Sequence, residues 1–198
     1  MVHITMIELL KLQIIPAIVG IIATFLSWLF VKYFFSPKLQ ISEYISKKGN
    51  DGRVAYRVKI MNCGYRMCSD IKIYAKLEVK GLEANLKNNY DSFYVDVSFN
   101  GIYPVLKKGK SILLHIYNKI QYDKNYYSDE FSKSVEKAFY LEDLFNLTND
   151  TNDTKLIIYV TATDNFSGVR KLYISKEYKR EDIKERIFNL DNVLMYSK

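Results

Sequence analysis

An uninterrupted apolar segment near the N-terminus is followed by segments in which apolar and polar residues alternate. No charged residue occurs from Leu12 to Val31, a run of 20 residues. An α-helix of this length crosses a hydrocarbon core about 30 Å thick. Trp28 and Tyr33 lie at the far end of the run, where amphipathic rings favour the headgroup region. The pattern predicts a transmembrane helix within an N-terminal segment of residues 1–35.

The flanks of the apolar run predict a retained anchor and its orientation. A cleaved signal peptide has a basic start and small residues at a cleavage site, whereas Lys11 is the one Lys or Arg before the run and no Ala-x-Ala pattern follows it. We expect the basic residues that follow the run to contact the membrane surface: Lys32, Lys38, Lys47 and Lys48. Because Lys-rich flanks stay cytoplasmic, we expect a single-pass protein of the cell's inner membrane, with the N-terminus outside and residues 36–198 cytoplasmic.

Two further features bear on the side of the membrane. Acceptor patterns for N-glycosylation begin at Asn146, Asn149, Asn152 and Asn165. They leave an extracellular placement open. Cys63 and Cys68 do not form a clear disulfide framework of the kind common in secreted domains. The absence of such a framework fits a cytoplasmic domain, and in a reducing cytoplasm we expect free thiols, with a transient redox pair as the alternative.

Small residues form one stripe along the predicted membrane helix. Ala17, Gly20, Thr24 and Ser27 are spaced by three or four positions, so they share a helix face. Small residues on one face let transmembrane helices approach closely. The stripe is consistent both with self-association in the membrane and with the ordinary composition of such helices.

Beyond the apolar run, apolar and polar residues alternate with a period of two. The apolar face runs from Val54 to Ile60 in RVAYRVKIM and from Ile71 to Val79 in IKIYAKLEV. Such alternation is typical of half-buried antiparallel strands. Further strands are expected at 39–46, 93–99, 111–117, 155–163 and 169–177. About seven strands predict a mainly β fold for residues 36–198, an immunoglobulin-like antiparallel β-sandwich with one or two short helices.

Two segments depart from the alternating pattern. Residues 118–154 form a helical or loop insertion, in which Phe131 and Val135 have helical spacing and Ser128 is placed to begin a helix. The segment 179–194, KREDIKERIFNLDNVL, predicts a short C-terminal helix. Its Ile183 and Ile187, four positions apart, would pack on the edge of the β domain.

Several short segments resemble the cytoplasmic immunoglobulin-like domain of inward-rectifier potassium channels. SPKLQIS follows the membrane helix, NDGRVAYRVKIMN and DIKIYAKLEV come next in the same order, and Tyr178, Ile183 and Phe188 keep the spacing near the end of that domain. The resemblance implies the sandwich fold. It also implies contact of basic residues after the helix with anionic headgroups, for which only Pro37 and Lys38 match, because the adjacent basic cluster of those channels is missing here. It does not imply potassium conduction, because the chain has one membrane helix and no TVGYG-like filter.

The residues of the chain form no catalytic signature. The sequence has no G-x-S-x-G, phosphate-binding glycine loop or H-E-x-x-H motif. His3 precedes the membrane helix and His115 lies on the polar face of a predicted strand. Two cysteines are too few for a structural zinc site. We therefore expect no enzyme, cofactor or metal.

The chain is basic, with a formal charge of +7, but its Lys and Arg are interleaved with acidic residues and match no nucleic-acid motif. Anionic membrane lipids explain this charge more simply, so we expect lipid partners and no nucleic acid. Two functions follow as hypotheses. One is a non-catalytic, membrane-anchored interaction or sensing module with a protein partner. The other is a defence-type effector whose membrane helices oligomerise and perturb the bilayer under control of the β domain.

Overall fold

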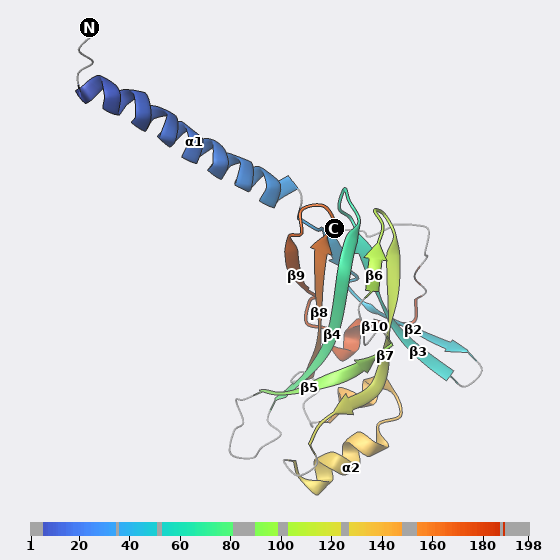
Figure 1. Cartoon of the computed structure of the whole chain (residues 1–198). Coiled ribbons are helices and arrows are strands. Elements are labelled where there is room, and N and C mark those ends of the chain that lie inside the picture. The colour runs from blue at the N-terminus through green and yellow to red at the C-terminus, as the bar shows by residue number, and fades with distance from the viewer. Residues whose placement is uncertain are drawn as a thin grey trace.

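The structure is a computed structural model that describes residues 6–34, 36–50, 53–80, 90–98, 103–123, 127–147, 154–186 and 188. Within these residues it contains one long N-terminal helix, a β domain and two short helices that belong to the β domain (Figure 1). The chain is mainly β, as predicted.

The N-terminal helix, α1 (Met6–Phe34), extends away from the β domain (Figure 1). The part from Lys11 to Val31 is long and apolar enough to cross a membrane, and none of it is buried. At 1.5 Å per residue these 21 residues span about 31 Å. Since no side chain from Lys11 to Val31 is buried, this span is not the core helix of a soluble domain, and the segment predicted from the sequence as a membrane anchor is present as one helix.

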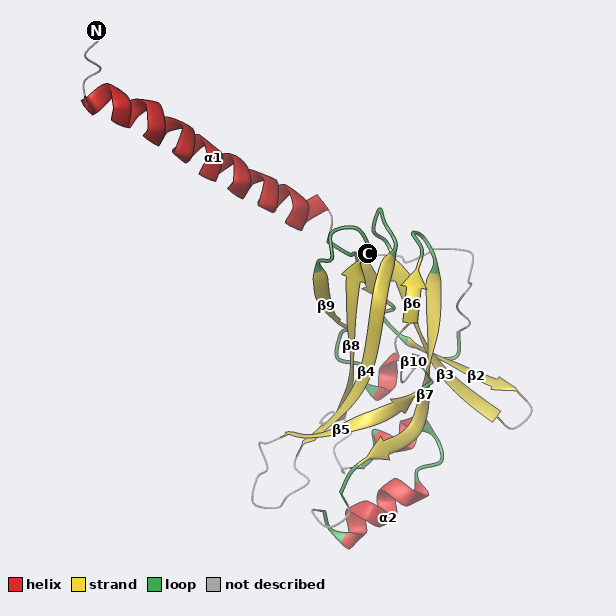
Figure 2. Cartoon of the chain, viewed as in Figure 1, coloured by secondary structure: helices red, strands yellow, loops and turns green. Residues whose placement is uncertain are grey.

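Ten strands among the described residues form one sheet (Figure 2). They are β1 (Leu39–Ile41), β2 (Ile45–Asn50), β3 (Arg53–Asn62), β4 (Cys68–Lys80), β5 (Tyr90–Val97), β6 (Tyr103–Leu106), β7 (Ser111–Gln121), β8 (Thr154–Asp164), β9 (Arg170–Ile174) and β10 (Ile183–Lys184). Their order is β10-β2-β3-β7-β5-β4-β8-β9, with β1 also paired to β3 and β6 to β4.

The predicted immunoglobulin-like sandwich is not confirmed, because the sheet curls into a half-barrel. Strands β4 and β8 are long, and the register of their pairing shifts between Ser69 and Lys72. A second shift, between Val95 and Val97, lies where β5 pairs with β7. Such irregularities increase local twist and bend a sheet. The apolar face is therefore buried inside the curl of one sheet and does not need a second sheet to cover it.

The alternation read from the sequence predicted the buried faces correctly. In β3, Val58 and Ile60 are fully buried. In β4, every second residue from Ile71 to Val79 is at most 4% exposed, and all five belong to the hydrophobic core. The core thus follows the inner face of the curled sheet.

The insertion contains α2 (Asp129–Lys137) and α3 (Leu141–Leu144), at the end of the β domain opposite α1 (Figure 1). The prediction that Ser128 begins a helix is confirmed, since its hydroxyl accepts a hydrogen bond from the Phe131 N–H at 3.2 Å. The ring of Phe131 stacks on Phe93 of β5 with centroids 5.4 Å apart. This contact fixes the insertion to the sheet.

The predicted helix over 179–194 is wrong for the residues that the structure describes. Arg180–Asp182 makes a single 3₁₀ turn, and Ile183 then pairs in parallel with Ile45 of β2. The free edge of β2 offers backbone hydrogen bonds that a short, charged helix would leave unused. Ile183 packs against the core, as expected from the sequence. Ile187 and residues 189–194 lie outside the described residues.

A polar cluster joins the hairpin of β2 and β3 to α3. The Tyr56 hydroxyl donates a hydrogen bond to the Glu142 carboxylate, and Lys47 Nζ lies 2.7 Å from Glu142 Oε1. Burial tends to raise the pKa of Glu142, but the hydrogen bonds from Lys47 and Tyr56 outweigh it, so the pKa lies below the ordinary value of 4.5. The charged form of Glu142 therefore stabilises the folded domain.

Glu142→Gln should lower the free energy of unfolding by about 1–3 kcal/mol near neutral pH, because hydrogen bonds to a charged group are lost. A folded-state pKa below 4.5 means that the contribution of Glu142 is complete above pH 4.5 and is lost as the pH falls through the folded-state value. Unfolding of the full chain in detergent, followed by the β signal in circular dichroism, checks both effects. Exposed Glu181→Gln is the matched control and should change stability by less than about 0.5 kcal/mol. Equal effects of the two substitutions would contradict this role for Glu142.

Candidate functional site

The join between α1 and the β domain is short and fixed to the domain. Four residues separate Phe34, the last residue of α1, from Leu39, the first of β1, which limits their separation to about 18 Å. The Tyr173 hydroxyl of β9 donates a hydrogen bond to the Pro37 carbonyl, and the Cys63 N–H donates to the Lys38 carbonyl at 2.8 Å. The chain is therefore held by the sheet directly after it leaves the helix.

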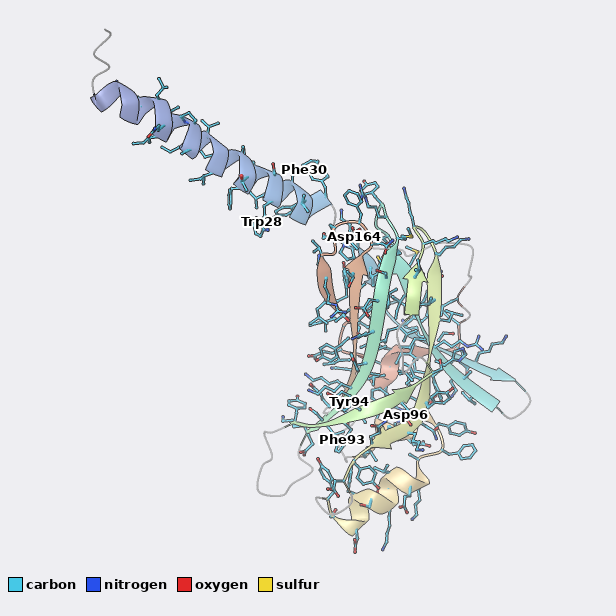
Figure 3. All side chains as sticks on the ribbon, viewed as in Figure 1. Trp28, Phe30, Phe93, Tyr94, Asp96 and Asp164 are labelled. Atoms are coloured by element: carbon cyan, nitrogen blue, oxygen red, sulfur yellow. The ribbon has the colours of Figure 1, made fainter. Side chains whose placement is uncertain are left out.

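Three loops lie at the same end of the sheet as this join (Figure 2). Cys68, at the start of β4, pairs with Leu106 at the end of β6 and with Asp164 at the end of β8. Figure 3 places Asp164 beside the end of α1 that carries Trp28 and Phe30. We call this surface the proximal rim, and it consists of residues 36–38, 63–67, 107–110 and 165–169.

Asn62 fixes the first loop of the proximal rim. Its side chain is fully buried and donates from Nδ2 to the carbonyls of Arg66 at 2.7 Å and Leu106 at 2.9 Å, while Oδ1 accepts from the Gly64 N–H at 2.9 Å. A Cβ on Gly64 would lie 3.3 Å from the Lys38 nitrogen, so glycine allows the join to pack closely against this loop. Asn62 thus organises the loop next to the membrane helix.

Asp164 fixes the loop between β8 and β9 in a similar way. The buried Oδ1 accepts from the N–H groups of Phe166 at 3.0 Å and Ser167 at 2.8 Å, and from the Ser167 hydroxyl at 2.9 Å. Gly168 has a φ of +68°, a conformation that glycine adopts without strain. The turn leaves the Phe166 side chain 74% exposed at the tip of the loop.

The proximal rim is basic and carries exposed apolar side chains. Its four segments contain five basic residues and no Asp or Glu: Lys38, Arg66, Lys107, Lys108 and Lys110. Tyr65 is also 74% exposed. The Arg66 guanidinium lies 4.2 Å from the centre of the Phe166 ring, and Lys108 Nζ lies 5.3 Å from the centre of the Tyr65 ring. Cationic groups next to exposed rings are the combination found at membrane–water interfaces.

The structure separates the four lysines that the sequence suggested as membrane contacts. Lys32 lies in the last turn of α1, and Lys38 is exposed in the proximal rim. Lys47 and Lys48 lie in β2, and Lys47 stands opposite Tyr56 of β3 in the pairing of the two strands. Because Tyr56 is six positions before the rim end of β3, Lys47 is about 20 Å from that end.

Most basic residues of the proximal rim could not be identified from the sequence. Arg66 and the lysines of residues 107–110 lie in segments with clear turn signals. However, it is the pairing of β4 with both β6 and β8 that brings these loops to one end of the sheet, and the pairing of β1 with β3 that brings Lys38 to the same end.

The small-residue stripe on α1 lies partly in a shallow groove. Ala17, Gly20 and Thr24 line the groove, together with the bulkier Phe25 and Trp28. The Thr24 hydroxyl donates to the Gly20 carbonyl at 2.8 Å, so its polar group is satisfied within the helix. Ser27 is exposed one turn further along, outside the residues that line the groove.

Among the described residues, which do not include His3, the remaining candidate groups lie apart from one another. Both cysteines are free thiols, as expected, with Cys63 exposed and Cys68 buried. The pKa of His115 is lowered by burial and by the nearby charge of Arg57. Over the described parts of the chain, no three His, Cys, Asp or Glu residues come together as metal ligands.

Thiol labelling of the folded chain should reach Cys63 and not Cys68. Burial and the nearby charge of Asp164 raise the pKa of Cys68 to about 11. Partial burial of its thiol also raises the pKa of Cys63, but Cys63 is exposed to solvent. A maleimide at about pH 8 reacts with the small thiolate fraction of an accessible cysteine. Mass spectrometry of the full chain in detergent should show one adduct, and the Cys63→Ser control none. Two adducts on the folded chain would contradict this burial of Cys68.

Comparisons with known proteins do not assign the chain to a family. No family model matches the sequence, and no curated protein matches it. One matching solved structure is the X-ray structure of Northeast Structural Genomics Consortium target SoR45, which is 13% identical. The match covers 82% of this chain and 97% of that one, with a TM-score of 0.29. A likeness at this level carries no argument about function.

Proposed function

We propose that the chain is a single-pass, membrane-anchored β domain that serves as a non-catalytic interaction or sensing module. The observation that carries the proposal is the short, hydrogen-bonded join between an exposed apolar helix and the proximal rim. A long flexible linker would let the domain search a large volume. This join instead holds one defined end of the domain at the membrane surface.

We place the β domain on the cytoplasmic side of the cell's inner membrane. Lys32 and Lys38 lie on that side of the helix, and the proximal rim adds four further basic residues in space. Positive residues next to a membrane helix favour the cytoplasmic face. The distribution of charge thus supports the placement predicted from the sequence.

The insertion offers a surface for a protein partner. It lies at the end of the domain opposite α1 (Figure 1), and Phe139, between α2 and α3, is 71% exposed. Asn118 of β7 donates hydrogen bonds to the carbonyls of Ala138 and Phe139, at 3.0 and 2.8 Å, which fix this segment on the sheet. A domain anchored through its proximal rim would present Phe139 toward the aqueous compartment.

The side of the membrane can be tested with a cysteine placed far from the proximal rim. In a Cys63→Ser background, Lys133→Cys on exposed α2 should react with a membrane-impermeant maleimide in inverted vesicles and not in intact spheroplasts. The same full chain should resist extraction with alkaline carbonate. Labelling only in spheroplasts would reverse the orientation, and release by carbonate would contradict the anchor.

The alternative is an effector whose membrane helices assemble and perturb the bilayer. It is supported by the groove that Ala17, Gly20 and Thr24 line on α1. A close helix–helix contact would use this face. Assembly would then be the step that the β domain controls.

Membrane potential separates the two functions. Under the anchored-module proposal, cells expressing the full chain should keep the same potential as cells expressing Gly20→Leu. A Cβ added at Gly20 meets no atom within 4 Å apart from the helix's own nearby backbone, so a side chain there points away from the rest of the chain and changes the surface available to another helix. Val19→Leu, on another face of α1, is the matched control. Depolarisation by the full chain and by Val19→Leu, lost with Gly20→Leu, would favour the effector and contradict the module.

A further inference from the structure

We propose that the proximal rim binds the anionic phospholipid headgroups of the bilayer in which α1 is anchored, with Tyr65 and Phe166 at the interface. This inference rests on the proposed function, since it takes α1 as membrane-spanning. It goes further by naming the partner of the proximal rim and the residues that recognise it. Among the surfaces that the structure describes, the proximal rim combines unbalanced charge, exposed rings and closeness to the membrane helix.

The position of the proximal rim follows from covalent geometry. Phe34 of α1 lines a small pocket together with Pro37, Gly64 and Tyr65. The end of the helix therefore contacts the rim itself. Since the apolar span ends at Val31, Phe34 lies within the headgroup layer, about 5 Å beyond the hydrocarbon edge. The join thus keeps the proximal rim within reach of the phospholipid headgroups.

The charge of the proximal rim has one sign. Its segments have five basic residues and no acidic residue. Among the described residues, two carboxylates border the proximal rim in sequence, and both have partners of their own: Asp70 pairs with Arg170, and the buried Asp164 accepts hydrogen bonds from its own turn. The positive potential therefore faces outward, and clusters of Lys and Arg next to a membrane helix attract anionic lipids.

The folded loops of the proximal rim hold the rings of Tyr65 and Phe166 in exposed positions before any lipid binds. The hydrogen bonds of Asp164 hold the loop that exposes Phe166, and those of Asn62 hold the loop that exposes Tyr65. Arg66 lies over one ring and Lys108 over the other. A ring at the acyl boundary with a cation at phosphate level is the arrangement that amphipathic surface anchors use.

Lipid binding explains this surface better than an acidic protein partner does. The join allows at most about 18 Å between the end of α1 and the start of β1. A bulky protein partner would have to enter this space and displace the headgroups that already contact the proximal rim. Lipid headgroups meet the rim without displacing the anchor. The five basic residues are spread over the rim. Separate lipid phosphates can accept hydrogen bonds from them at several points, as this spread requires.

The test uses the full chain in nanodiscs, with an environment-sensitive fluorophore on exposed Cys63. Nanodiscs contain phosphatidylcholine alone or with phosphatidylglycerol, and a small fraction of lipid carries a headgroup nitroxide quencher. Quenching should increase with phosphatidylglycerol and decrease with salt. In the same samples, brominated acyl chains should quench Trp28, the only Trp of the chain. Loss of Trp28 quenching would signal failure of the anchor, which is separate from failure of the lipid site.

Matched variants assign the effect to the proximal rim. Replacing Lys107, Lys108 and Lys110 by Gln should lower the equilibrium constant for docking of the proximal rim on the lipid by about 100-fold. This factor follows from the usual binding free energy of a basic residue near anionic lipid. Replacing Lys119, Lys133 and Lys137 by Gln makes the same change in charge away from the rim and should have no effect. Phe166→Ser should reduce quenching in both lipid mixtures. Quenching that does not change with phosphatidylglycerol, with salt or with the rim variant would overturn the proposal, as would quenching that free phosphate abolishes but sodium chloride of the same ionic strength does not.

Discussion

The join between α1 and β1 constrains the position of the rest of the molecule. Four residues connect the helix to the sheet, and hydrogen bonds to Pro37 and Lys38 attach them to β9 and to the loop before β4. Whatever holds α1 therefore also positions the end of the sheet where the proximal rim lies. The opposite end, with α2 and α3, is then the part that a partner from solution can reach.

The curled sheet makes such a join possible. Because β4 pairs with β6 and β8 at one end and with β5 and β8 further along, loops from distant parts of the sequence lie side by side. Two buried polar residues, Asn62 and Asp164, then use backbone hydrogen bonds to shape the loops. Buried polar groups need such partners, and here they give exposed Tyr65 and Phe166 rigid supports.

Local patterns predicted what depends on local chemistry. The apolar run indicated α1, the period of two indicated the buried faces of β3 and β4, and Ser128 was correctly placed at the start of α2. Pairing between distant segments was not predictable in this way. Ile183 joins the sheet through Ile45, which turned an expected helix into a strand, and the same kind of pairing made one curled sheet where two were expected. The proximal rim was missed for the same reason, since Lys38 lies beside residues 63–67 and 107–110 only after β1 and β7 have paired with β3, and β6 with β4.

The depth of the proximal rim relative to the bilayer tests the account most directly. A nitroxide on Cys63 of the full chain in phospholipid bilayers can be located by power-saturation electron paramagnetic resonance, with oxygen and a water-soluble nickel complex as relaxation agents. We expect a depth within the headgroup layer, while a nitroxide on Lys133→Cys in the Cys63→Ser chain should be in bulk water. A Cys63 nitroxide as exposed to the nickel complex as that at position 133 would contradict the claim that the join holds the proximal rim at the membrane.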